Sequence, residues 1–237
     1  MKFYVVIPAR YNSSRFPGKV LADIGSKTML EHAFENAMKS KASGVFIATD
    51  NDKVFQVAQK FTKNVFMTSD SNINGTERIA ELAKILEWPD ETLVINLQAD
   101  MPQLQYDNID LLADKARDNL GLSTLYYDLQ SSDLKKDRNA VKICINNSKI
   151  SFYREVDKAV KGDIFRHIGI YAYYVRDLKA YKHLGQSSNE KNLSLEQYRF
   201  VDNGYKISAY LATSDPGVSI DSLDNLNQLK GINHWII

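Results

Sequence analysis

Short apolar runs of strand length alternate with longer amphipathic runs along the first half of this chain, and this alternation limits the folds that are open to it. The strand-like runs are rich in β-branched and aromatic residues and cover positions 3–7, 45–49, 65–68 and 93–97. The helix-like runs cover positions 29–39, 53–61, 76–86 and 106–117. Strands separated in this way pair in parallel through right-handed crossovers, so we predict an α/β fold with a mostly parallel sheet flanked by helices.

The second half of the sequence has more strand character. Strand-like runs cover positions 123–129, 141–145, 150–153, 168–175 and 207–211, and helices are expected at 194–201 and 222–230. Thr76 and Asp52 are the expected N-caps of two earlier helices. Because the sequence has no long linker, repeat or low-complexity tract, we predict one domain over residues 1–237 with an inserted antiparallel lobe at roughly 121–175.

The composition excludes several classes of protein. Of 237 residues, 44% are hydrophobic, which is enough for the core of one large domain. Lys and Arg number 30 against 29 Asp and Glu, so no overall field attracts nucleic acid or an anionic membrane. The start does not resemble a signal peptide, no apolar run reaches about 18 residues, and the single cysteine, Cys144, lies in an apolar run. We expect a soluble, cytoplasmic protein without a disulfide, a nucleic-acid partner or a membrane insertion.

A cationic, hydroxyl-rich loop follows the first predicted strand. Pro8 ends that strand because proline has no N–H to give to a sheet, and Arg10, Ser13, Arg15 and Lys19 follow. Open α/β sheets bind ligands at this carboxyl edge, where each charge-assisted contact to phosphate contributes about 1.5–3 kcal/mol. The loop has neither the spacing of a P-loop nor a G-x-G-x-x-G motif. It is therefore either a polyphosphate-binding loop of another kind or an ordinary solvated loop.

Two aspartates follow apolar runs in the same way. Asp100 comes directly after the run at 93–97, and Asp221 comes after 218–220, just before the last predicted helix. Mg²⁺ prefers one or two carboxylates and completes its coordination with water and substrate phosphates. Either aspartate alone is more typical of a helix cap or a turn. Together with the cationic loop, however, the pair predicts a site for Mg²⁺ and a triphosphate.

Small and polar residues follow two other predicted strands. Ala48, Thr49 and Asp50 end the second, and the segment 69–78 (SDSNINGTER) follows the third. Such strand ends offer hydroxyls and backbone N–H groups of the kind that hold a base and a ribose, although each alone is an ordinary turn.

Four further polar residues lie in the second half. Arg166 and His167 precede a predicted strand, and Glu196 and Gln197 lie on a predicted helix. Residues of these types are more often found on the surface than in a site. The remaining histidines have no metal-ligand spacing and are expected to be surface or packing residues: His32, His183 and His234.

Eight sequence blocks, in order, give the chain a specific resemblance. They are IPARYNSSRFPGKVLADI, ATD at 48–50, MTSDSNINGTERIAE, VINLQADMP, NAVKICI, FRHIGIYAY, SLEQYRFVDNGYKI and PGVSIDSLDNL. The chain resembles the bacterial 3-deoxy-manno-octulosonate cytidylyltransferase (CMP-KDO synthetase) family over nearly its whole length. The resemblance implies a Rossmann-like nucleotidyltransferase sheet with a smaller antiparallel lobe, a homodimer, and Mg²⁺-dependent coupling of CTP to the acid sugar KDO. The products would be CMP-KDO, for lipopolysaccharide biosynthesis, and pyrophosphate.

The resemblance also implies roles for individual residues. The triphosphate loop would comprise Arg10, Ser13, Arg15 and Lys19, of which Lys19 and Arg15 would stabilise the departing pyrophosphate. Asp100 and Asp221 would bind Mg²⁺, and Asp100 would be catalytic. Residues around cytidine and ribose would be Ala48, Thr49, Asp50, Ser69, Thr76, Arg78 and Gln98. Residues around the sugar would be Arg154, Arg166, His167, Tyr171, Glu196 and Gln197.

Departures from the family pattern fall on the acceptor side. Ala99 and Met101 flank the first aspartate where the family has a glycine and an acidic or amide residue, Tyr153 replaces a serine, the stretch 155–159 replaces a Pro-rich one, and Ser222 replaces a threonine. A methionine makes no useful hydrogen bond to a sugar hydroxyl. The acceptor could therefore be KDO, an amino-substituted KDO or another nonulosonic acid. More distant alternatives are a nucleotidyltransferase for a neutral sugar phosphate and a non-catalytic nucleotide-binding module.

Overall fold

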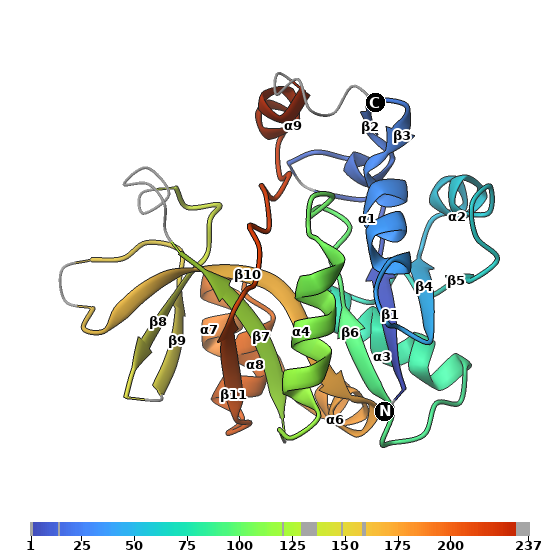
Figure 1. Cartoon of the computed structure of the whole chain (residues 1–237). Coiled ribbons are helices and arrows are strands. Elements are labelled where there is room, and N and C mark those ends of the chain that lie inside the picture. The colour runs from blue at the N-terminus through green and yellow to red at the C-terminus, as the bar shows by residue number, and fades with distance from the viewer. Residues whose placement is uncertain are drawn as a thin grey trace.

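Figure 1 shows the computed structural model of the chain, which describes residues 2–13, 15–119, 121–128, 137–147, 149–157 and 160–230. The strands are β1 (Phe3–Pro8), β2 (Asp23–Ile24), β3 (Lys27–Thr28), β4 (Gly44–Thr49), β5 (Val65–Met67), β6 (Leu93–Asn96), β7 (Leu122–Tyr127), β8 (Lys142–Asn146), β9 (Lys149–Tyr153), β10 (Asp163–Tyr174) and β11 (Ile207–Leu211). The helices are the short 3₁₀ helix η1 (Lys19–Leu21), α1 (Met29–Met38), α2 (Asp52–Ala58), α3 (Gly75–Ile85), α4 (Tyr106–Ala116), α6 (Val175–His183), α7 (Ser188–Leu193), α8 (Gln197–Asp202) and α9 (Leu223–Lys230).

The central sheet has the strand order β11-β7-β10-β6-β1-β4-β5. β1 pairs in parallel with β4 and β6, β4 pairs in parallel with β5, and β11 pairs in parallel with β7. β10 runs antiparallel to both of its neighbours, β6 and β7. The prediction of an α/β fold with a mostly parallel sheet is confirmed.

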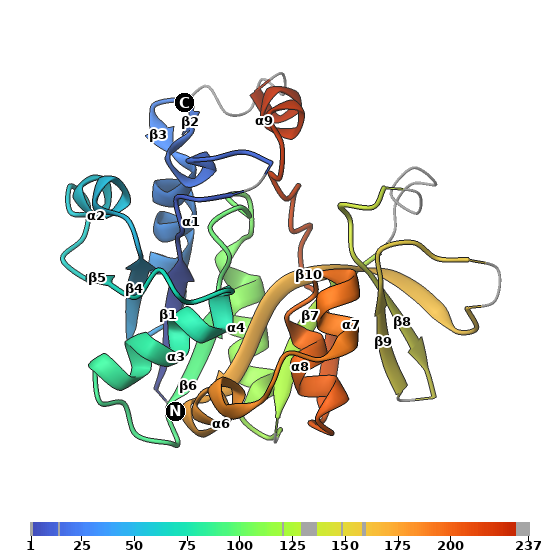
Figure 2. The same cartoon turned by 180° about the vertical axis from the view of Figure 1, so that it is seen from behind.

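Helices cover both faces of this sheet, as Figures 1 and 2 show from opposite sides. On one face, α1, α2 and α4 pack against alternate strand residues such as Val5 and Ile95. On the other face, α3, α6 and α8 pack against their neighbours Val6 and Val94. Because both faces are buried, the central strands β1, β4 and β6 are apolar at most positions, which makes them recognisable in the sequence.

The smaller antiparallel lobe consists of β8, β9 and the first part of β10. β10 is 12 residues long and pairs with β8 over residues 163–166 and with β6 over residues 171–174. This strand therefore runs from the lobe into the central sheet (Figure 2). The predicted lobe at 121–175 also includes β7 and the end of β10, which belong to the central sheet, and the division of the chain into domains stays a prediction.

The two N-caps predicted from the sequence are wrong by one or two positions. Asn74 caps α3 and accepts a hydrogen bond from the Glu77 N–H at 2.9 Å, so Thr76 lies inside the helix. Asn51 caps α2 and accepts from the Lys53 N–H at 3.0 Å, so Asp52 is likewise helical. In both places an asparagine with extended backbone satisfies the first free N–H groups before the predicted residue is reached.

The second half differs from the prediction in its helices. α6 and α7 were not expected, and α8 begins at Gln197, three positions after the predicted start at 194. Ser194 has a left-handed backbone with φ of 52°, which ends α7 and separates it from α8. The predicted strand end at Leu129 and the third uninvolved histidine, His234, lie outside the described residues.

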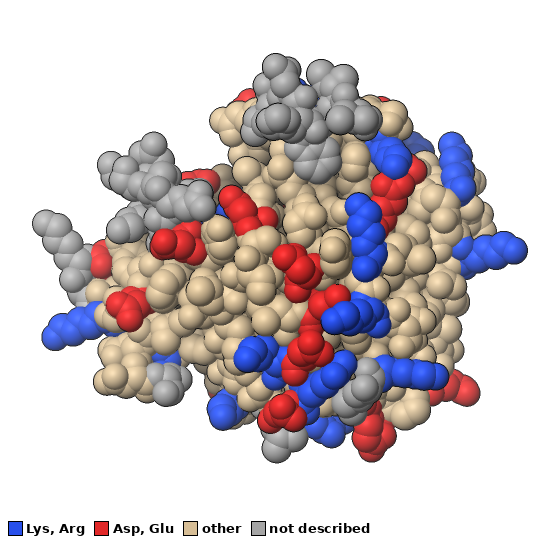
Figure 3. All heavy atoms as spheres, in the orientation of Figure 1, with Lys and Arg blue, Asp and Glu red and all other residues tan. Residues whose placement is uncertain are grey.

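Two features of the surface bear on the excluded partner classes. On the face drawn in Figure 3, the cationic and anionic side chains of the described residues are interspersed instead of forming one broad basic surface. Within the described ranges, no helix is both long enough and apolar enough to cross a membrane.

Candidate active site

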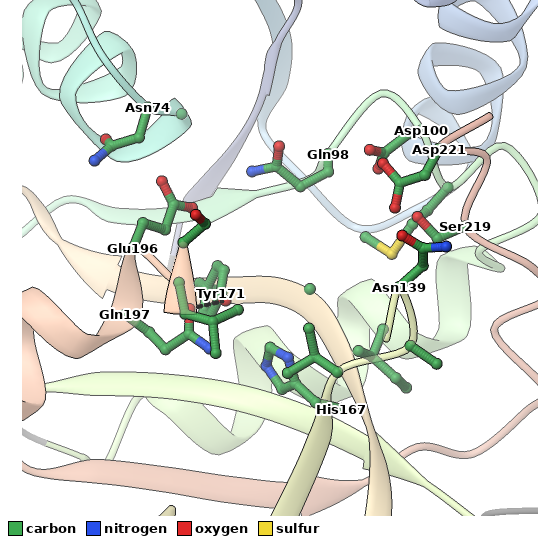
Figure 4. Close-up of a pocket in the computed structure, with 18 of the residues that line it drawn as sticks. Asn74, Gln98, Asp100, Asn139, His167, Tyr171, Glu196, Gln197, Ser219 and Asp221 are labelled. Atoms are coloured by element: carbon green, nitrogen blue, oxygen red, sulfur yellow. Dashed lines mark hydrogen bonds between the residues drawn. The ribbon is translucent and has the colours of Figure 1, made fainter. Parts of the chain in front are cut away.

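A cavity of about 940 Å³ opens where the central sheet meets the lobe. Its walls come from the ends of β1 and β6, the start of α3, the lobe, the start of α8 and the segment before α9. Figure 4 shows that Asp100 and Asp221 lie at one end, Glu196 and Gln197 lie at the other, and Gln98 lies between them. Parallel strands end at this edge, which is where open α/β sheets bind ligands.

The cationic loop after β1 is closed by its own backbone. The Gly18 N–H donates to the Tyr11 carbonyl at 2.8 Å, and Gly18 has a φ of 72°, in the left-handed region that favours glycine. A Cβ at this position would lie 3.1 Å from the Tyr11 ring. The closed loop places Lys19, the first residue of η1, beside Asp100 and Asp221 at one end of the cavity.

Lys19 is held between both predicted metal ligands. Its Nζ lies 2.6 Å from Asp100 Oδ2 and 3.1 Å from Asp221 Oδ1, and it also donates to the Ile220 carbonyl at 3.3 Å. Burial lowers the pKa of Lys19, but the charges and hydrogen bonds of the two aspartates outweigh burial and raise it. Lys19 is therefore a permanent cation that is paired with both carboxylates.

Arg15 is the second cation at this end. Its Nη2 lies 2.9 Å from Asp221 Oδ1, and its Nη1 donates to Asn139 of the lobe. Arg10 is exposed and lines the cavity, whereas Ser13 is half-buried and outside the cavity lining. Arg10 and Arg15 thus face the cavity, and the predicted contact of Ser13 with a triphosphate stays a prediction.

The arrangement of Asp100 and Asp221 fits Mg²⁺. Both carboxylates converge on a single cation, Lys19, at the rim of a cavity large enough for a nucleotide. Within the described ranges, no three residues of the types His, Cys, Asp and Glu come together as a metal site. A site with two carboxylates suits Mg²⁺, which completes its coordination with water and phosphate oxygens, better than a cation that needs a full protein cage.

The predicted base and ribose residues fall into two groups. Arg78 and Gln98 line the cavity, whereas the others are not among the residues that line it: Ala48, Thr49, Asp50, Ser69 and Thr76. Arg78 is buried, and its guanidinium lies 2.6 Å from Asp50 Oδ2 and donates to Thr68 Oγ1 at 2.6 Å. Arg78 therefore joins the ends of β4 and β5, and its predicted contact with the nucleotide stays a prediction.

The acceptor side is formed by buried polar groups. His167, Tyr171, Glu196 and Gln197 all line the cavity. The Tyr171 hydroxyl donates to Gln197 Oε1 at 3.0 Å, while Gln197 Nε2 is buried without a hydrogen-bond partner among the described residues. A buried amide donor without a partner is costly, so this N–H₂ group is suited to meet a ligand oxygen.

Burial favours the neutral form of three of these groups. It lowers the pKa of His167 to about 3, so the imidazole is neutral and pairs with Thr124 Oγ1 at 3.0 Å. Burial also raises the pKa of Tyr171 and of Glu196. Glu196 Oε2 nevertheless accepts a hydrogen bond from the Thr76 N–H at 3.2 Å, which opposes that rise.

The two predicted sugar-side arginines have different surroundings. Arg154 donates to the carbonyls of Leu193, Ser194 and Arg138 at 2.9, 3.0 and 3.3 Å. Arg166 also lines the cavity, and its pKa is lowered by burial although the charge of Asp215 opposes this. Arg154 thus ties the lobe to the turn between α7 and α8, which leaves Arg166 as the better candidate for an anionic ligand.

Sequence reasoning missed several residues of the cavity wall. Asn74, Asn139 and Ser219 line the cavity, and Figure 4 shows Ser219 and Asn139 beside Asp221. Each lies within a sequence block that carries the family resemblance, so the signal was present. Their types, however, are common in turns, and only the fold brings them together.

Comparisons with known proteins show which family the chain resembles. A family model described as Cytidylyltransferase matches residues 4–207. A 3-deoxy-manno-octulosonate cytidylyltransferase of Haemophilus influenzae is 36% identical over 98% of both chains, and one of Pseudoalteromonas translucida is 39% identical over 95% of both. The solved structure of a CMP:2-keto-3-deoxy-manno-octonic acid synthetase in complex with CTP is 31% identical and covers 100% of both chains with a TM-score of 0.87.

Proposed function

The chain belongs to the 3-deoxy-manno-octulosonate cytidylyltransferase family, and from this premise we propose that it couples CTP to KDO, giving CMP-KDO and pyrophosphate for lipopolysaccharide biosynthesis. The observation that carries the proposal is the convergence of Lys19, Asp100 and Asp221 at one end of a cavity whose other end presents Glu196 and Gln197. One end suits a metal-bound triphosphate, and the other suits a polyhydroxylated acceptor.

The reaction is an attack of the anomeric hydroxyl of the sugar on the α-phosphorus of CTP, with pyrophosphate as the leaving group. Reactions of this kind are accelerated mainly by positioning and by stabilisation of charge on the phosphate oxygens. Lys19 and Arg15 provide fixed positive charge at the end of the cavity that holds the aspartates. We assign them to the phosphates of CTP and to the departing pyrophosphate.

The resting site neutralises itself, because Lys19 and Arg15 are paired with Asp100 and Asp221. We propose that Asp100 and Asp221 hold Mg²⁺, which neutralises phosphate charge and orients phosphate oxygens when bound. With Mg²⁺ held there, Lys19 and Arg15 would be free to pair with phosphate oxygens in place of the carboxylates. Little uncompensated charge is created during this exchange, which matters in a partly buried site.

The acid sugar occupies the other end of the cavity in this proposal. Arg166 pairs with its carboxylate, because the N–H groups of Arg154 already donate to three backbone carbonyls. Neutral His167 and the free amide donor of Gln197 meet sugar hydroxyls or ring oxygens. Groups of this kind select an acceptor by its pattern of hydroxyls rather than by charge alone.

The test is a panel of acceptors with CTP and Mg²⁺, with the product identified by mass spectrometry. Formation of CMP-KDO supports the proposal. If only amino-substituted KDO or another nonulosonic acid gives a cytidylylated product, the proposal that the enzyme uses CTP would stand, and the proposed acceptor KDO would be replaced by that sugar. Product only from a neutral sugar phosphate would overturn the acid-sugar assignment, and CTP binding without any product would indicate a non-catalytic module.

We also propose that the protein is a homodimer. The family resemblance implies this assembly. Half-buried apolar side chains of the lobe, α8 and β11 pack around a small core cluster, and a second copy could cover the parts that are still exposed: Ile145, Ile150, Val201, Ile207 and Ala209. Light scattering that gives twice the mass of 26.9 kDa supports the dimer, and a mass of one chain contradicts it.

Two broader expectations complete the proposal. A cytoplasmic location follows from the use of CTP, and recovery of the protein in a membrane or secreted fraction would contradict it. One domain over residues 1–237 predicts a single cooperative unfolding transition, because the lobe shares β10 with the central sheet.

A further inference from the structure

The segment 213–221, which we call the strap, connects β11 to α9 and ends at Asp221. Figure 1 shows it rising beside α4 as an irregular red segment without helix or strand. One of the two proposed metal ligands therefore lies on irregular backbone. Its position depends on the contacts that fix the strap, and three of these come from Asp100, from the turn that follows it and from α4.

The first anchor is Asn108, a fully buried residue of α4. Its Oδ1 accepts hydrogen bonds from the Thr213 N–H at 2.9 Å and the Thr213 hydroxyl at 3.1 Å. Its Nδ2 donates to the Ser214 hydroxyl at 3.0 Å and to the Ser214 carbonyl at 3.2 Å. The start of the strap is thus fixed by a side chain that belongs to the core.

The second anchor is Gln103, in the turn between Asp100 and α4. Its Oε1 accepts a hydrogen bond from the Val218 N–H at 2.9 Å. Gly217 packs directly against the same side chain: a Cβ at position 217 would lie 2.3 Å from Gln103 Cβ. Gly217 also has a φ of 70°, so glycine is required there both by conformation and by space.

The third contact joins the end of the strap to the other proposed metal ligand. The Ile220 N–H donates to the Asp100 carbonyl at 2.9 Å, and Lys19 contacts the Ile220 carbonyl and the Asp221 carboxylate. Between the Asn108 anchor and this contact, strap N–H groups donate to few side chains. Among the described residues, Gln103 is the only side chain outside the strap that accepts such a hydrogen bond. Loss of that bond would let the strap shift just before Asp221.

We propose that Gln103 is a positioning residue, which fixes the strap so that Asp221 completes the metal and triphosphate end of the cavity. This inference rests on the proposed function. Gln103 itself lies in the cavity wall, but its role is carried out through the Val218 N–H and the close contact with Gly217. Residues that orient a metal ligand without binding the metal commonly have a large effect on metal affinity.

The test compares wild type with Gln103→Met, which keeps the length of the side chain and removes the acceptor. We expect the Mg²⁺ concentration for half-maximal activity to rise by up to roughly tenfold, the lower end of the effect of losing a direct partner of a metal ligand, because Gln103 acts on Asp221 only through the strap. The kcat at saturating Mg²⁺ should change by less than about twofold, because the reacting groups are intact. Independently of activity, amide hydrogen exchange of a peptide covering 213–221 should become faster.

Two further variants serve as controls. Gln103→Glu keeps an acceptor for the Val218 N–H and should retain slow amide exchange and a Mg²⁺ requirement near that of wild type. Gln56→Met makes the same change on the exposed side of α2 and should alter neither quantity. An unchanged Mg²⁺ requirement and unchanged exchange in Gln103→Met would overturn the assignment of Gln103. A wild type whose activity does not depend on Mg²⁺ would instead contradict the proposed function, whatever the exchange data show.

Discussion

The two ends of the cavity handle charge in opposite ways. At the nucleotide end, Lys19 lies between Asp100 and Asp221, so full charges stand in pairs within 3.1 Å. At the acceptor end, burial shifts the pKa values of His167 and Glu196 toward their neutral forms. The end that we assign to the nucleotide therefore holds paired charges that a ligand can replace, while the end that we assign to the acceptor presents the neutral side chains of His167, Tyr171 and Gln197.

This difference matches the ligands proposed for each end. A metal-bound triphosphate brings charges of both signs, and exchange of partners avoids leaving a buried charge unpaired. A sugar brings hydroxyls, which neutral side chains can distinguish by geometry. Arg166, at the acceptor end, is the exception that suits the single carboxylate of an acid sugar.

The largest effect is expected from the metal carboxylate. Asp100→Asn should reduce kcat at least roughly 100-fold, because an amide cannot replace an anionic ligand beside the reacting phosphate. The fold should be retained, since Asp100 is at the cavity surface. Steady-state kinetics at saturating Mg²⁺ measure the effect, with the exposed Asp118→Asn as the matched control. Wild-type turnover in Asp100→Asn would contradict the metal assignment.

The next largest effect is expected from Lys19, and it separates the pairing of Lys19 with the two carboxylates from its role in catalysis. Lys19→Met should reduce kcat roughly 100-fold, because one fixed cation near the leaving group is lost. In the absence of CTP, however, the same variant should bind Mn²⁺ more tightly than wild type, since Lys19 no longer competes for the two carboxylates. Titration followed by Mn²⁺ spectroscopy measures this. Weaker or equal Mn²⁺ binding in Lys19→Met would show that Lys19 does not compete with a metal ion for Asp100 and Asp221.

At the acceptor end, two arginines should behave differently. Arg166→Met should raise KM for KDO roughly 10- to 100-fold with little change in KM for CTP, as expected for loss of a charged contact to a carboxylate. Arg154→Met should chiefly lower the thermal midpoint, because three hydrogen bonds to backbone carbonyls are lost. The reverse pattern would place the sugar carboxylate on Arg154.

The smallest effect concerns stability and pH. Because the pKa of His167 is about 3 in the folded protein, against an ordinary value of 6.5, only the unfolded chain takes up a proton there between these values. The free energy of unfolding should therefore fall as pH falls from about 6.5 toward 3, with a contribution of up to about 1.4 kcal/mol per pH unit.

Urea unfolding at several pH values measures this contribution. His167→Gln should show a shallower dependence than wild type below pH 6.5, because the group that titrates is gone. The same change at the exposed His183 should leave the dependence unaltered. Parallel curves for wild type and His167→Gln would mean that His167 is accessible to protons in the folded protein.

Much of the central sheet could be predicted because its residues are buried on both faces. β1, β4 and β6 are mostly apolar runs, and α1, α3 and α4 show the helical period. The edge strand β5 is short, and its apolar composition identified it although only Val65 is buried. The N-caps failed because Asn51 and Asn74 compete with the neighbouring Asp52 and Thr76 as first caps. Helix α7 was missed because it is only six residues long and polar. Helix α6 was missed although its buried residues Val175, Leu178 and Tyr181 recur at helical spacing, because Val175 was assigned to the preceding strand.

The site was partly predictable for a similar reason. Lys19, Asp100 and Asp221 follow strand ends or apolar runs, so position in the fold could be read from position in the sequence. The tether formed by Arg154 and the anchor formed by Gln103 could not, because each depends on a contact with a segment distant in the chain. Sequence reasoning thus identified Lys19, Asp100 and Asp221 as candidates but did not identify the contacts that fix the position of Asp221 or of the lobe.

The measurement that tests the central claim most directly is pyrophosphate release with CTP, KDO and Mg²⁺, repeated with each component omitted and with UTP in place of CTP. If both ends of the cavity serve one reaction, release requires all three components and is far slower with UTP. Release that continues without KDO, or its absence in the complete mixture, would contradict the account.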